Sequence, residues 1–466
     1  MRYDGTSRFR RGSRWQLSPS FSLGWNIAQE EFWKPIENIA NLLKVRFSYG
    51  ELGNQNINNW YPTYRTISIG SLNGDWLQNG LSPNTSSVGG LINTALTWEK
   101  VRTWDVGVDY GLFNNRLTGS FDYFVRFTEG MVGPSAELPA TLGISTPSSN
   151  NSDLRTKGWE VSIGWKDRLK NGLGYGINLS LSDQITMIDS YPDNKTLSID
   201  SYLPGYKDGL IWGYETIGIA KSDEEMQAHL ASLPKGGQDA VGSQWAAGDI
   251  MYKDLNGDGK ISEGARTLGD HGDLKILGDT YSHYFFGIDL NADWKGFDFR
   301  AFFQGVLKHD YWGSGNFTGM LFGVRGGYSR WHTRGFKQHE DYFRAEPAGL
   351  EGHELPANLD SYYPRPIFSD SSDGTSFGAK NQKVQSRYVQ DASYIRLKNL
   401  QFGYTLPAKF TNKFGINRLR IFVSGENVWT GTGLTKLFDP ETISGGNGGN
   451  AYPLSRTWSF GLSLTL

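Results

Sequence analysis

The sequence contains no cysteine, so disulfide bonds and cysteine-ligated metals are excluded. It also lacks any uninterrupted apolar run of about 18 residues, the length that a membrane-spanning helix needs. The mean hydropathy of −0.47 is that of a polar chain. These absences leave a transmembrane β-barrel open, because a barrel strand places apolar residues only at every second position.

An excess of charge of one sign is missing too. Lys and Arg number 46 against 48 Asp and Glu, and no basic cluster stands out, which excludes nucleic acid as a partner. Aromatic residues make up 14% of the chain, so disorder is excluded as well. A chain of 466 residues exceeds one ordinary soluble core unless a single large sheet closes on itself.

Motifs of catalysis are absent. The seven His residues include no His-Glu-x-x-His pair, and no Gly-x-Ser-x-Gly elbow occurs. Asp and Glu pairs are too numerous to select a glycosidase dyad. We therefore expect that the protein is not an enzyme, with an outer-membrane hydrolase as the least favoured alternative.

Alternation of apolar and polar residues dominates what is present. Leu43, Val45 and Phe47 alternate with polar residues, as in a strand with one wet face. Asn114-Asn115 and Lys295-Gly296 are tight turns between such strands. The pattern predicts eleven strands, near residues 15–27, 43–49, 104–112, 117–125, 159–166, 173–183, 284–294, 297–307, 393–406, 418–427 and 457–466.

The connections between these strands alternate strictly in length. Outer-membrane barrels pair short periplasmic turns with long extracellular loops, whereas soluble sandwiches have short connections at both ends. The sequence therefore predicts an all-β fold, a transmembrane antiparallel β-barrel. Eleven strands cannot close such a barrel, so we expect the C-terminal portion of a roughly 22-stranded barrel of the plugged-transporter class. The long extracellular loops are expected at 51–102, 127–156, 184–283, 308–392 and 428–456.

The alternation also predicts which strand residues face lipid and which face the lumen. The expected lipid-facing residues are Phe299, Phe303, Leu419, Ile421, Phe460 and Leu462. Wet, lumen-facing positions are expected at Arg300, Gln304 and Arg420.

A series of different short motifs occurs in order along the whole chain. They are Asp4–Phe9 with Phe21–Trp25, Leu43–Gly50 with Gly53–Gln55, Trp98–Lys100, Gly158–Glu160, Gly248–Ile250 with Asp254–Ile261, Lys295–Asp298 with Phe302–Gly305, Ala392–Asn399 with Gly403–Pro407, and Asp439–Glu441. Together they resemble the SusC/RagA family of TonB-linked outer-membrane proteins. The resemblance implies TonB-dependent import of glycan fragments or peptides across the outer membrane of a Bacteroidetes-type bacterium, with a SusD-like surface lipoprotein as partner.

The chain departs from that family in two ways. The plug domain, the TonB box and the first barrel strands are absent, so we expect residues 1–466 alone not to transport and the TonB complex to contact the missing N-terminal part. Family members commonly end in Phe, whereas this chain ends in Leu466. A soluble or surface glycan-binding β-protein without transport is the alternative, and it would not need detergent.

One segment matches part of a calcium-binding loop. Asp254, Asn256 and Asp258 occupy its first, third and fifth positions, but Ala265 replaces the acid at the twelfth. An Asn-Gly-Asp-Gly turn without metal is the favoured alternative. The candidate ligands of an extracellular Ca²⁺ are Asp254, Asn256, Asp258, Lys260 and Glu263.

Aromatic residues are frequent in the predicted extracellular loops. Their rings could stack on sugars or peptide side chains, or pack the loops and form an interfacial girdle. The loops at 184–283 and 308–392 are far longer than a connection requires, so we expect them to form the ligand and partner surface. The candidate substrate-binding residues are Trp312, Trp331, Tyr311, Trp245 and Trp429.

Overall fold

The protein is described by a computed structural model. It covers residues 1–466 except 56, 58, 71–76, 136–138, 140, 142, 145, 314–320, 323–335, 368–378 and 444–450. Unit 1 consists of residues 1–165 and 182–208, and unit 2 of residues 166–181 and 209–466. In the residues so described, none of the helices has the length and apolar character required to cross a membrane.

The main element of the fold is an eleven-stranded antiparallel sheet. Its hydrogen-bonded neighbours follow the order β21-β20-β19-β16-β15-β10-β9-β8-β7-β4-β3. Each of the eleven predicted strands appears in it, which confirms the all-β prediction and the expected number of strands.

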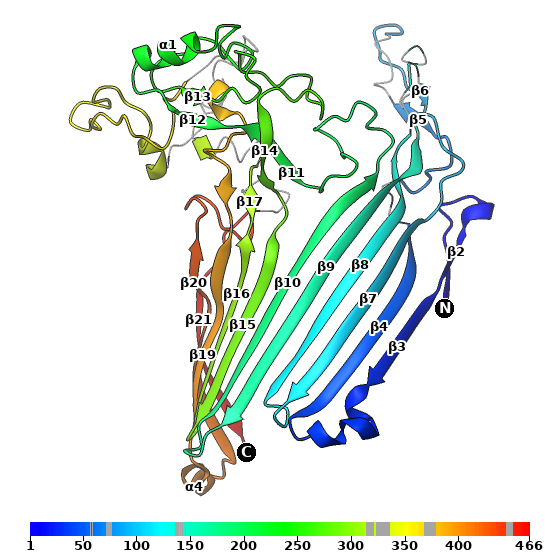
Figure 1. Cartoon of the computed structure of the whole chain (residues 1–466), viewed down its shortest axis with the longest axis vertical. Coiled ribbons are helices and arrows are strands. Elements are labelled where there is room, and N and C mark those ends of the chain that lie inside the picture. The colour runs from blue at the N-terminus through cyan, green and yellow to red at the C-terminus, as the bar shows by residue number, and fades with distance from the viewer. Residues whose placement is uncertain are drawn as a thin grey trace. The chain divides into compact units, whose positions relative to one another are not determined.

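Unit 1 contains the N-terminal strands, and β4, β7, β8 and β9 lie side by side (Figure 1). Its long strands are β3 (Ser20–Asn26), β4 (Ala40–Asn54), β7 (Glu99–Leu112), β8 (Leu117–Pro134), β9 (Ser148–Arg168) and β10 (Gly174–Ser190), the last two shared with unit 2. Two small hairpins pair β1 (Arg2–Gly5) with β2 (Trp15–Ser18) and β5 (Ile67–Gly70) with β6 (Thr85–Val88). Short 3-10 helices lie at η1 (Arg11–Ser13), η2 (Ile27–Gln29) and η3 (Glu31–Ile36).

In unit 1, apolar residues of neighbouring strands pair with apolar residues, and charged residues pair with charged ones. One row across five strands is wholly apolar, namely Leu23, Phe47, Val106, Tyr123 and Trp159. On the opposite face Arg46 pairs with Asp109 at 2.9 Å and with Asp122 at 2.8 Å. The unit therefore has one apolar and one charged face, as the alternation predicts.

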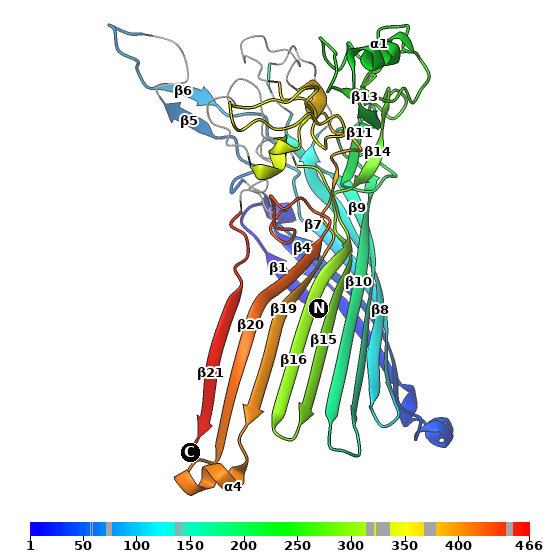
Figure 2. The ribbon, with the colours of Figure 1, turned by 90° about the vertical axis from the view of Figure 1, so that its left-hand side faces the viewer.

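Unit 2 contains the C-terminal strands, which lie side by side with short turns at one end (Figure 2). Its long strands are β15 (His283–Trp294), β16 (Phe297–Lys308), β19 (Tyr394–Thr405), β20 (Arg418–Thr432) and β21 (Thr457–Thr465). Shorter strands are β11 (Leu210–Tyr214), β12 (Thr216–Ile219), β13 (Ile250–Tyr252), β14 (Leu274–Asp279), β17 (Asp310–Tyr311) and β18 (Gln390–Asp391). The helices are α1 (Asp223–Ala231), η5 (Lys337–Glu340), η7 (Lys380–Gln382), α4 (Ala408–Thr411) and η8 (Asn412–Phe414).

The ladder of unit 2 separates the residues predicted to face opposite sides. Phe299, Phe402, Val423 and Phe460 are consecutive partners in one row. The next row is polar and consists of Arg300, Gln401, Ser424 and Ser459. The six predicted lipid-facing residues share the first face, and Arg300, Gln304 and Arg420 share the second, where Arg420 binds Asp298 and Arg300 binds Asp289.

Two tight turns have the backbone that their residues favour. Asn114 and Asn115 have φ of 58° and 60°, and they connect β7 to β8. Lys295 and Gly296 have φ of 48° and 91°, and Trp294 pairs directly with Phe297. Asn and Gly tolerate the left-handed region, so Gly296 helps to close a two-residue hairpin, and Asn114 and Asn115 turn the chain within the four-residue link 113–116.

Several predicted boundaries were wrong. β8 continues to Pro134 and β9 begins at Ser148, so most of the loop expected at 127–156 is strand. The extra strand residues are largely polar, which hides the alternation from sequence analysis. The first predicted strand, 15–27, is instead divided at Pro19 into β2 and β3, and β2 pairs with β1.

A β-bulge interrupts the alternation in β19. Phe302 faces Asn399 and Phe303 faces Leu397, which leaves Lys398 as an extra residue. Beyond the bulge Arg396 pairs with Gln304, on the polar face. Arg396 is buried there and binds Asp439 and Glu441 of the β20–β21 link, each at 2.7 Å.

Candidate functional site

The long links of unit 2 form a packed region, here named the loop body, of residues 209–279 and 337–391 without 368–378. β11 pairs with β14, and β12 pairs with β13. Tyr214 joins the two links through its backbone, since its amide donates to Val384 and its carbonyl accepts from Ser386, both at 2.9 Å. The loops at 184–283 and 308–392 are therefore not independent of each other.

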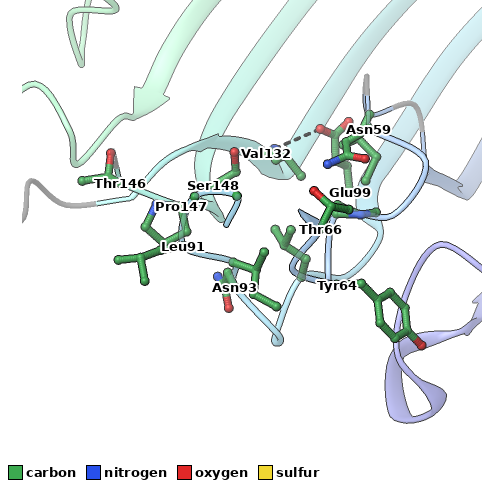
Figure 3. A pocket seen from close by; sticks show the side chains of 16 residues that line it. Asn59, Tyr64, Thr66, Leu91, Asn93, Glu99, Val132, Thr146, Pro147 and Ser148 are labelled. Atoms are coloured by element: carbon green, nitrogen blue, oxygen red, sulfur yellow. Dashed lines mark hydrogen bonds between the residues drawn. The ribbon is translucent and has the colours of Figure 1, made fainter. Parts of the chain in front are cut away.

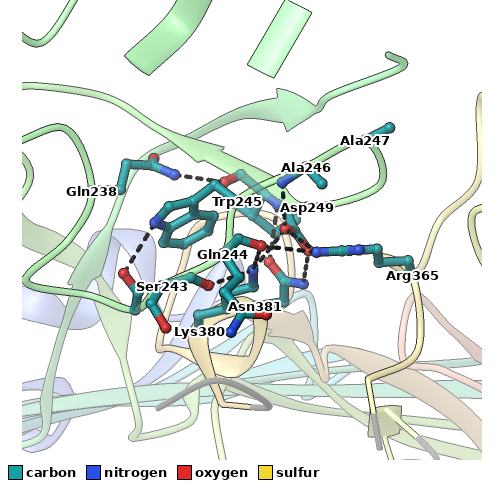
Figure 4. Close-up of polar contacts among 12 residues, drawn as sticks. Gln238, Ser243, Gln244, Trp245, Ala246, Ala247, Asp249, Arg365, Lys380 and Asn381 are labelled. Atoms are coloured by element: carbon teal, nitrogen blue, oxygen red, sulfur yellow. Dashed lines mark hydrogen bonds and ion pairs between the residues drawn. The ribbon is translucent and has the colours of Figure 1, made fainter. Parts of the chain in front are cut away.

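Asp249 is the centre of a buried polar cluster in the loop body (Figure 4). Arg365 donates to both of its carboxylate oxygens at 2.8 Å. Lys380 donates to it at 2.7 Å and Asn381 at 2.9 Å. The amide of Ala246 completes the shell at 2.9 Å. Residues more than 100 positions apart in sequence thus meet at one carboxylate.

Lys380 is as deeply buried as Asp249, and both side chains are 0% exposed. Its ammonium also donates to the carbonyls of Ser243 at 2.9 Å and Gln244 at 2.8 Å, and lies 4.6 Å from the centre of the Trp245 ring. Burial lowers the pKa of Lys380, opposed by Asp249. Burial alone would raise the pKa of Asp249, but its hydrogen bonds to Arg365, Lys380 and Asn381 outweigh this and hold the pKa below its usual value.

Trp245 packs in this cluster rather than at a surface. Its side chain is 7% exposed, and its Nε1 donates to the carbonyl of Gly242 at 3.1 Å. The ring packs edge-on against buried Tyr252 at 6.4 Å. It therefore offers little area to a ligand in this conformation.

The other predicted substrate-binding aromatics do not gather in one place. Tyr311 and Trp312 are neighbours at β17, where the Tyr311 hydroxyl donates to the Ile443 carbonyl at 3.1 Å. Trp429 was expected in a loop but lies in β20, 50% exposed and opposite Leu397 on the apolar face. Such a position suits the interfacial girdle better than ligand contact. Trp331 lies outside the described residues.

The carboxylates of the predicted calcium loop bind the loop's own backbone. Asp254 accepts from the amides of Gly257 at 2.6 Å and Gly259 at 2.9 Å. Asn256 accepts from the amide of Asp258 at 2.9 Å, and Asp258 from that of Lys260 at 3.1 Å. These are local turns, with Gly257 and Gly259 in the left-handed region.

The remaining candidate ligand, Glu263, pairs with Arg266 at 2.8 Å. Buried Asp273 accepts from the amides of Leu255 and Ser262, both at 2.8 Å, and so holds the two ends of the loop together. Burial raises the pKa of Asp273, although the hydrogen bonds from these backbone amides act to lower it. Within the described part of the chain, no group of three or more His, Cys, Asp or Glu residues is arranged to hold a metal ion.

Helix α1 is attached to the same core. Ser222 caps its first turn by accepting from the amide of Glu225 at 3.2 Å. His229 contacts Gln238 at 3.2 Å, and Gln238 accepts from the amide of Tyr252 at 2.6 Å. Burial lowers the pKa of His229, with the Gln238 contact acting in the opposite direction.

Unit 1 contains a separate hollow of about 450 Å³ (Figure 3). Its walls come from residues 57, 59–66, 89–99, 132 and 146–148, so both sides of the β5–β6 hairpin contribute. Glu99 lies in the wall and accepts from the amide of Val132 at 2.9 Å.

Sequence analysis missed the two cations at Asp249 and the whole hollow. Asp249 belongs to a quoted motif, but Lys380 and Arg365 lie in polar links without periodicity. Only tertiary pairing shows that Lys380 is buried and that the half-buried Arg365 lies against the same carboxylate. No signal marks the walls of the hollow, since Asn, Thr, Gly and Pro are ordinary loop residues.

Comparison with known proteins agrees with the fold. Residues 1–208 match the family model described as TonB dependent receptor-like, beta-barrel. The chain is 29% identical over 99% of its length to TonB-dependent receptor P3 of Formosa agariphila, and covers 43% of that protein. It is 24% identical over 100% of its length to TonB-dependent receptor SusC of Bacteroides thetaiotaomicron, and covers 41% of it.

Solved structures show the same fold. The RagAB peptide transporter superimposes with a TM-score of 0.70 at 20% identity, over 99% of this chain and 45% of that one. Its closed-closed state gives a TM-score of 0.67 over the same share. These matches confirm the resemblance to SusC/RagA proteins, and this chain spans less than half the length of the relatives it matches.

Proposed function

We propose that this chain, a segment of an outer-membrane β-barrel homologous to TonB-dependent receptors, supplies part of the wall and outer loops of an importer. The importer takes up glycan fragments or peptides together with a SusD-like surface lipoprotein. TonB drives it through the part of the protein that the relatives carry outside the matched region. The proposal gives the chain no catalytic role.

The observation that carries this proposal is the two-faced strand ladder with structured links at one end. Apolar rows such as Phe299 to Phe460 suit lipid, and the paired charges of Arg300 and Arg420 suit a wet lumen. The loop body is far larger than a connection requires, and hydrogen bonds and ion pairs join its two links. Such a structured region suits a surface that binds a partner.

A short deletion in the loop body tests the partner role. Residues 349–354 form an exposed tip between Ala348 and Leu355, whose backbones pair at 2.8 and 3.0 Å. Replacing this tip with Gly-Gly in the full-length transporter leaves the Asp249 cluster intact. We expect capture of the lipoprotein to weaken about tenfold, equivalent to about 1.4 kcal/mol, with a fall in uptake.

Barrel assembly is measured in parallel by heat-modified electrophoretic mobility. Normal capture and uptake in this variant and in a series of further deletions within 308–392 would remove these loops from the mechanism. Loss of uptake on deleting TonB from the host tests energy coupling separately.

A further inference from the structure

The hollow beside the β5–β6 hairpin has the construction of a ligand site, and it is here named the Glu99 pocket. It is lined by residues 57, 59–66 and 89–99 and by the ends of β8 and β9 (Figure 3). Its volume of about 450 Å³ lies in the range of roughly 300–1,000 Å³ for small-molecule sites.

Hydrogen bonds hold the walls in place. Glu99 accepts from the Asn54 amide group at 2.7 Å and from the backbone amide of Val132 at 2.9 Å. Asn150 accepts from the amide of Thr97 at 2.9 Å and donates to the carbonyl of Thr97 at 3.0 Å. The pocket is therefore formed in advance, which lowers the entropic cost of binding.

An apolar cluster forms the base of the pocket. Phe9, Leu96 and Trp98 are buried together, and Ile57 and Val132 pack against them. Leu96, Ile57 and Val132 also line the hollow. A ligand thus meets a firm apolar floor beneath a polar rim.

The lining has little charge in the part that the structure describes. Among the described residues that line it, Glu99 is the one carboxylate, and none is Lys, Arg, His or Asp. An anionic ligand would meet the like charge of Glu99, while the nearby guanidinium groups of Arg8 and Arg65 are engaged by the backbone carbonyls of Ile57 and Gly89. An ionised carboxylate has about four acceptor sites, so Glu99 can accept from a ligand hydroxyl besides its two protein donors.

Hydroxyl and amide groups supply the polarity. The amide oxygens of Asn59 and Asn93 accept from the backbone amides of Tyr61 and Ala95, both at 2.9 Å. This engages the oxygen of each side chain and directs the NH₂ group to the remaining partners. The hydroxyl groups of the lining belong to Tyr64, Thr66, Thr146 and Ser148.

We propose that the Glu99 pocket binds a neutral, polyhydroxylated ligand, the chemistry of an uncharged oligosaccharide end. Hydroxyl donors would reach Glu99, hydroxyl acceptors would reach the NH₂ groups of Asn59 and Asn93, and the apolar face of a sugar ring would cover the floor. The inference rests on the proposed import function and deepens it, because it names the chemical class of one ligand and separates its site from the loop body.

Calorimetric titration of the full-length protein in detergent tests the proposal. The probes are maltotriose, cellotriose and laminaritriose, with trigalacturonic acid as an anionic counterpart and N-acetyl-trialanine amide as a neutral peptide. We expect at least one neutral trisaccharide to bind and trigalacturonic acid to bind at least roughly tenfold more weakly.

Asn93→Asp keeps the oxygen that accepts from Ala95 but removes the NH₂ donor and adds a negative charge to the lining. We expect it to weaken binding roughly fivefold or more. Asn171→Asp is the matched control, because Asn171 accepts from the amide of Leu173 at 3.0 Å in the same kind of turn outside the pocket. Leu91→Trp, which fills the pocket, should abolish binding.

Three results would overturn the inference. The first is that none of the three neutral trisaccharides binds, and the second is that wild type and both pocket variants bind a trisaccharide equally tightly. The third is that the acetylated peptide binds as tightly as the trisaccharides and loses binding in Leu91→Trp to the same extent. The titration needs neither TonB nor a membrane potential. If the transporter takes up substrate but no probe binds in the pocket, only this inference is refuted. If a probe binds in the pocket but the transporter shows no uptake, only the proposed function is refuted.

Discussion

The sheet and the loop body of unit 2 distribute polarity in opposite ways. In the sheet, apolar residues such as Phe460, 87% exposed, cover one surface, and charges pair on the other. In the loop body the charges of Asp249 and Lys380 lie at the centre, with aromatic rings packed around them. The exposed apolar face of the sheet suits lipid, whereas the buried centre of the loop body is shielded from any solvent.

The difference shows which substitution each region tolerates least. A surface in lipid is damaged by an added charge, because no water solvates it. A buried ion cluster is damaged by a removed charge, because the remaining partners lose their compensation. Matched substitutions in the two regions can test this contrast.

The largest expected effect is in the loop body. Asp249→Ala leaves Lys380 and Arg365 without their carboxylate, and we expect a loss of about 3–5 kcal/mol of local stability. Faster hydrogen exchange and proteolysis of residues 209–279 and 337–391 would report it, with barrel assembly unchanged. Asp360→Ala is the control, because the Asp360 ion pair with Lys221 is exposed and should contribute little to stability. Equal protection in both variants would contradict the central role of Asp249.

The second effect is in the sheet. Leu462→Arg places a charge on the apolar face and should cost about 2–4 kcal/mol near the centre of the membrane, whereas Gln304→Arg on the polar face should cost little. The assembled fraction of the full-length transporter, measured by heat-modified mobility, compares them. Equal assembly would show that the faces are assigned wrongly.

A smaller effect comes from pH. The folded-state pKa of His229 is below its ordinary value of 6.5, so its contribution to stability is complete above that value and is lost as the pH falls towards the folded pKa. Because His229 is only partly buried and its contact with Gln238 opposes the effect of burial, the loss should be small. Hydrogen exchange of α1 at pH 7.5 and pH 5 measures it, and His229→Gln should remove part of the dependence. An unchanged dependence in that variant would assign it to other groups.

The smallest effect is expected from calcium. The carboxylates of the predicted calcium loop already accept from backbone amides, and Asp273 closes the loop from inside. We therefore expect the chelator EGTA and added calcium chloride to leave the exchange of residues 254–273 unchanged. Protection that rises with calcium in wild type but not in Asp258→Asn would establish a metal site instead.

Strands were predictable because lipid imposes a period of two on them. The rows through Phe47 and Phe299 are direct consequences of that alternation. The end of β9 escaped prediction because successive polar residues such as Asn150 and Asn151 do not alternate with apolar ones. The end of β8 escaped it because two register shifts near Met131 interrupt its period of two.

The candidate sites were less predictable, because loop packing depends on partners distant in sequence. Aromatic composition suggested Trp245 and Trp429 as ligand contacts, yet one lies in a core and the other on the apolar face of a strand. Asp249 and Lys380, whose side chains bind each other, are 131 residues apart in the sequence. No local sequence pattern connects these two residues, and no such pattern connects the segments that line the Glu99 pocket.

The bulge at Lys398 gives β19 two phases along one strand. Toward the short turn, even-numbered residues such as Phe402 lie on the apolar face, whereas beyond the bulge Arg396 is even-numbered and lies on the polar face. Without the bulge, the even-numbered Arg396 would lie on the same face as Phe402, away from Asp439 and Glu441, whereas deleting Lys398 would leave Leu397 opposite Phe303 and Arg396 opposite Gln304. A residue inserted or deleted within 399–405 would exchange the two faces of the strand, so the bulge is the place where β19 can change length and keep Arg396 in its contacts.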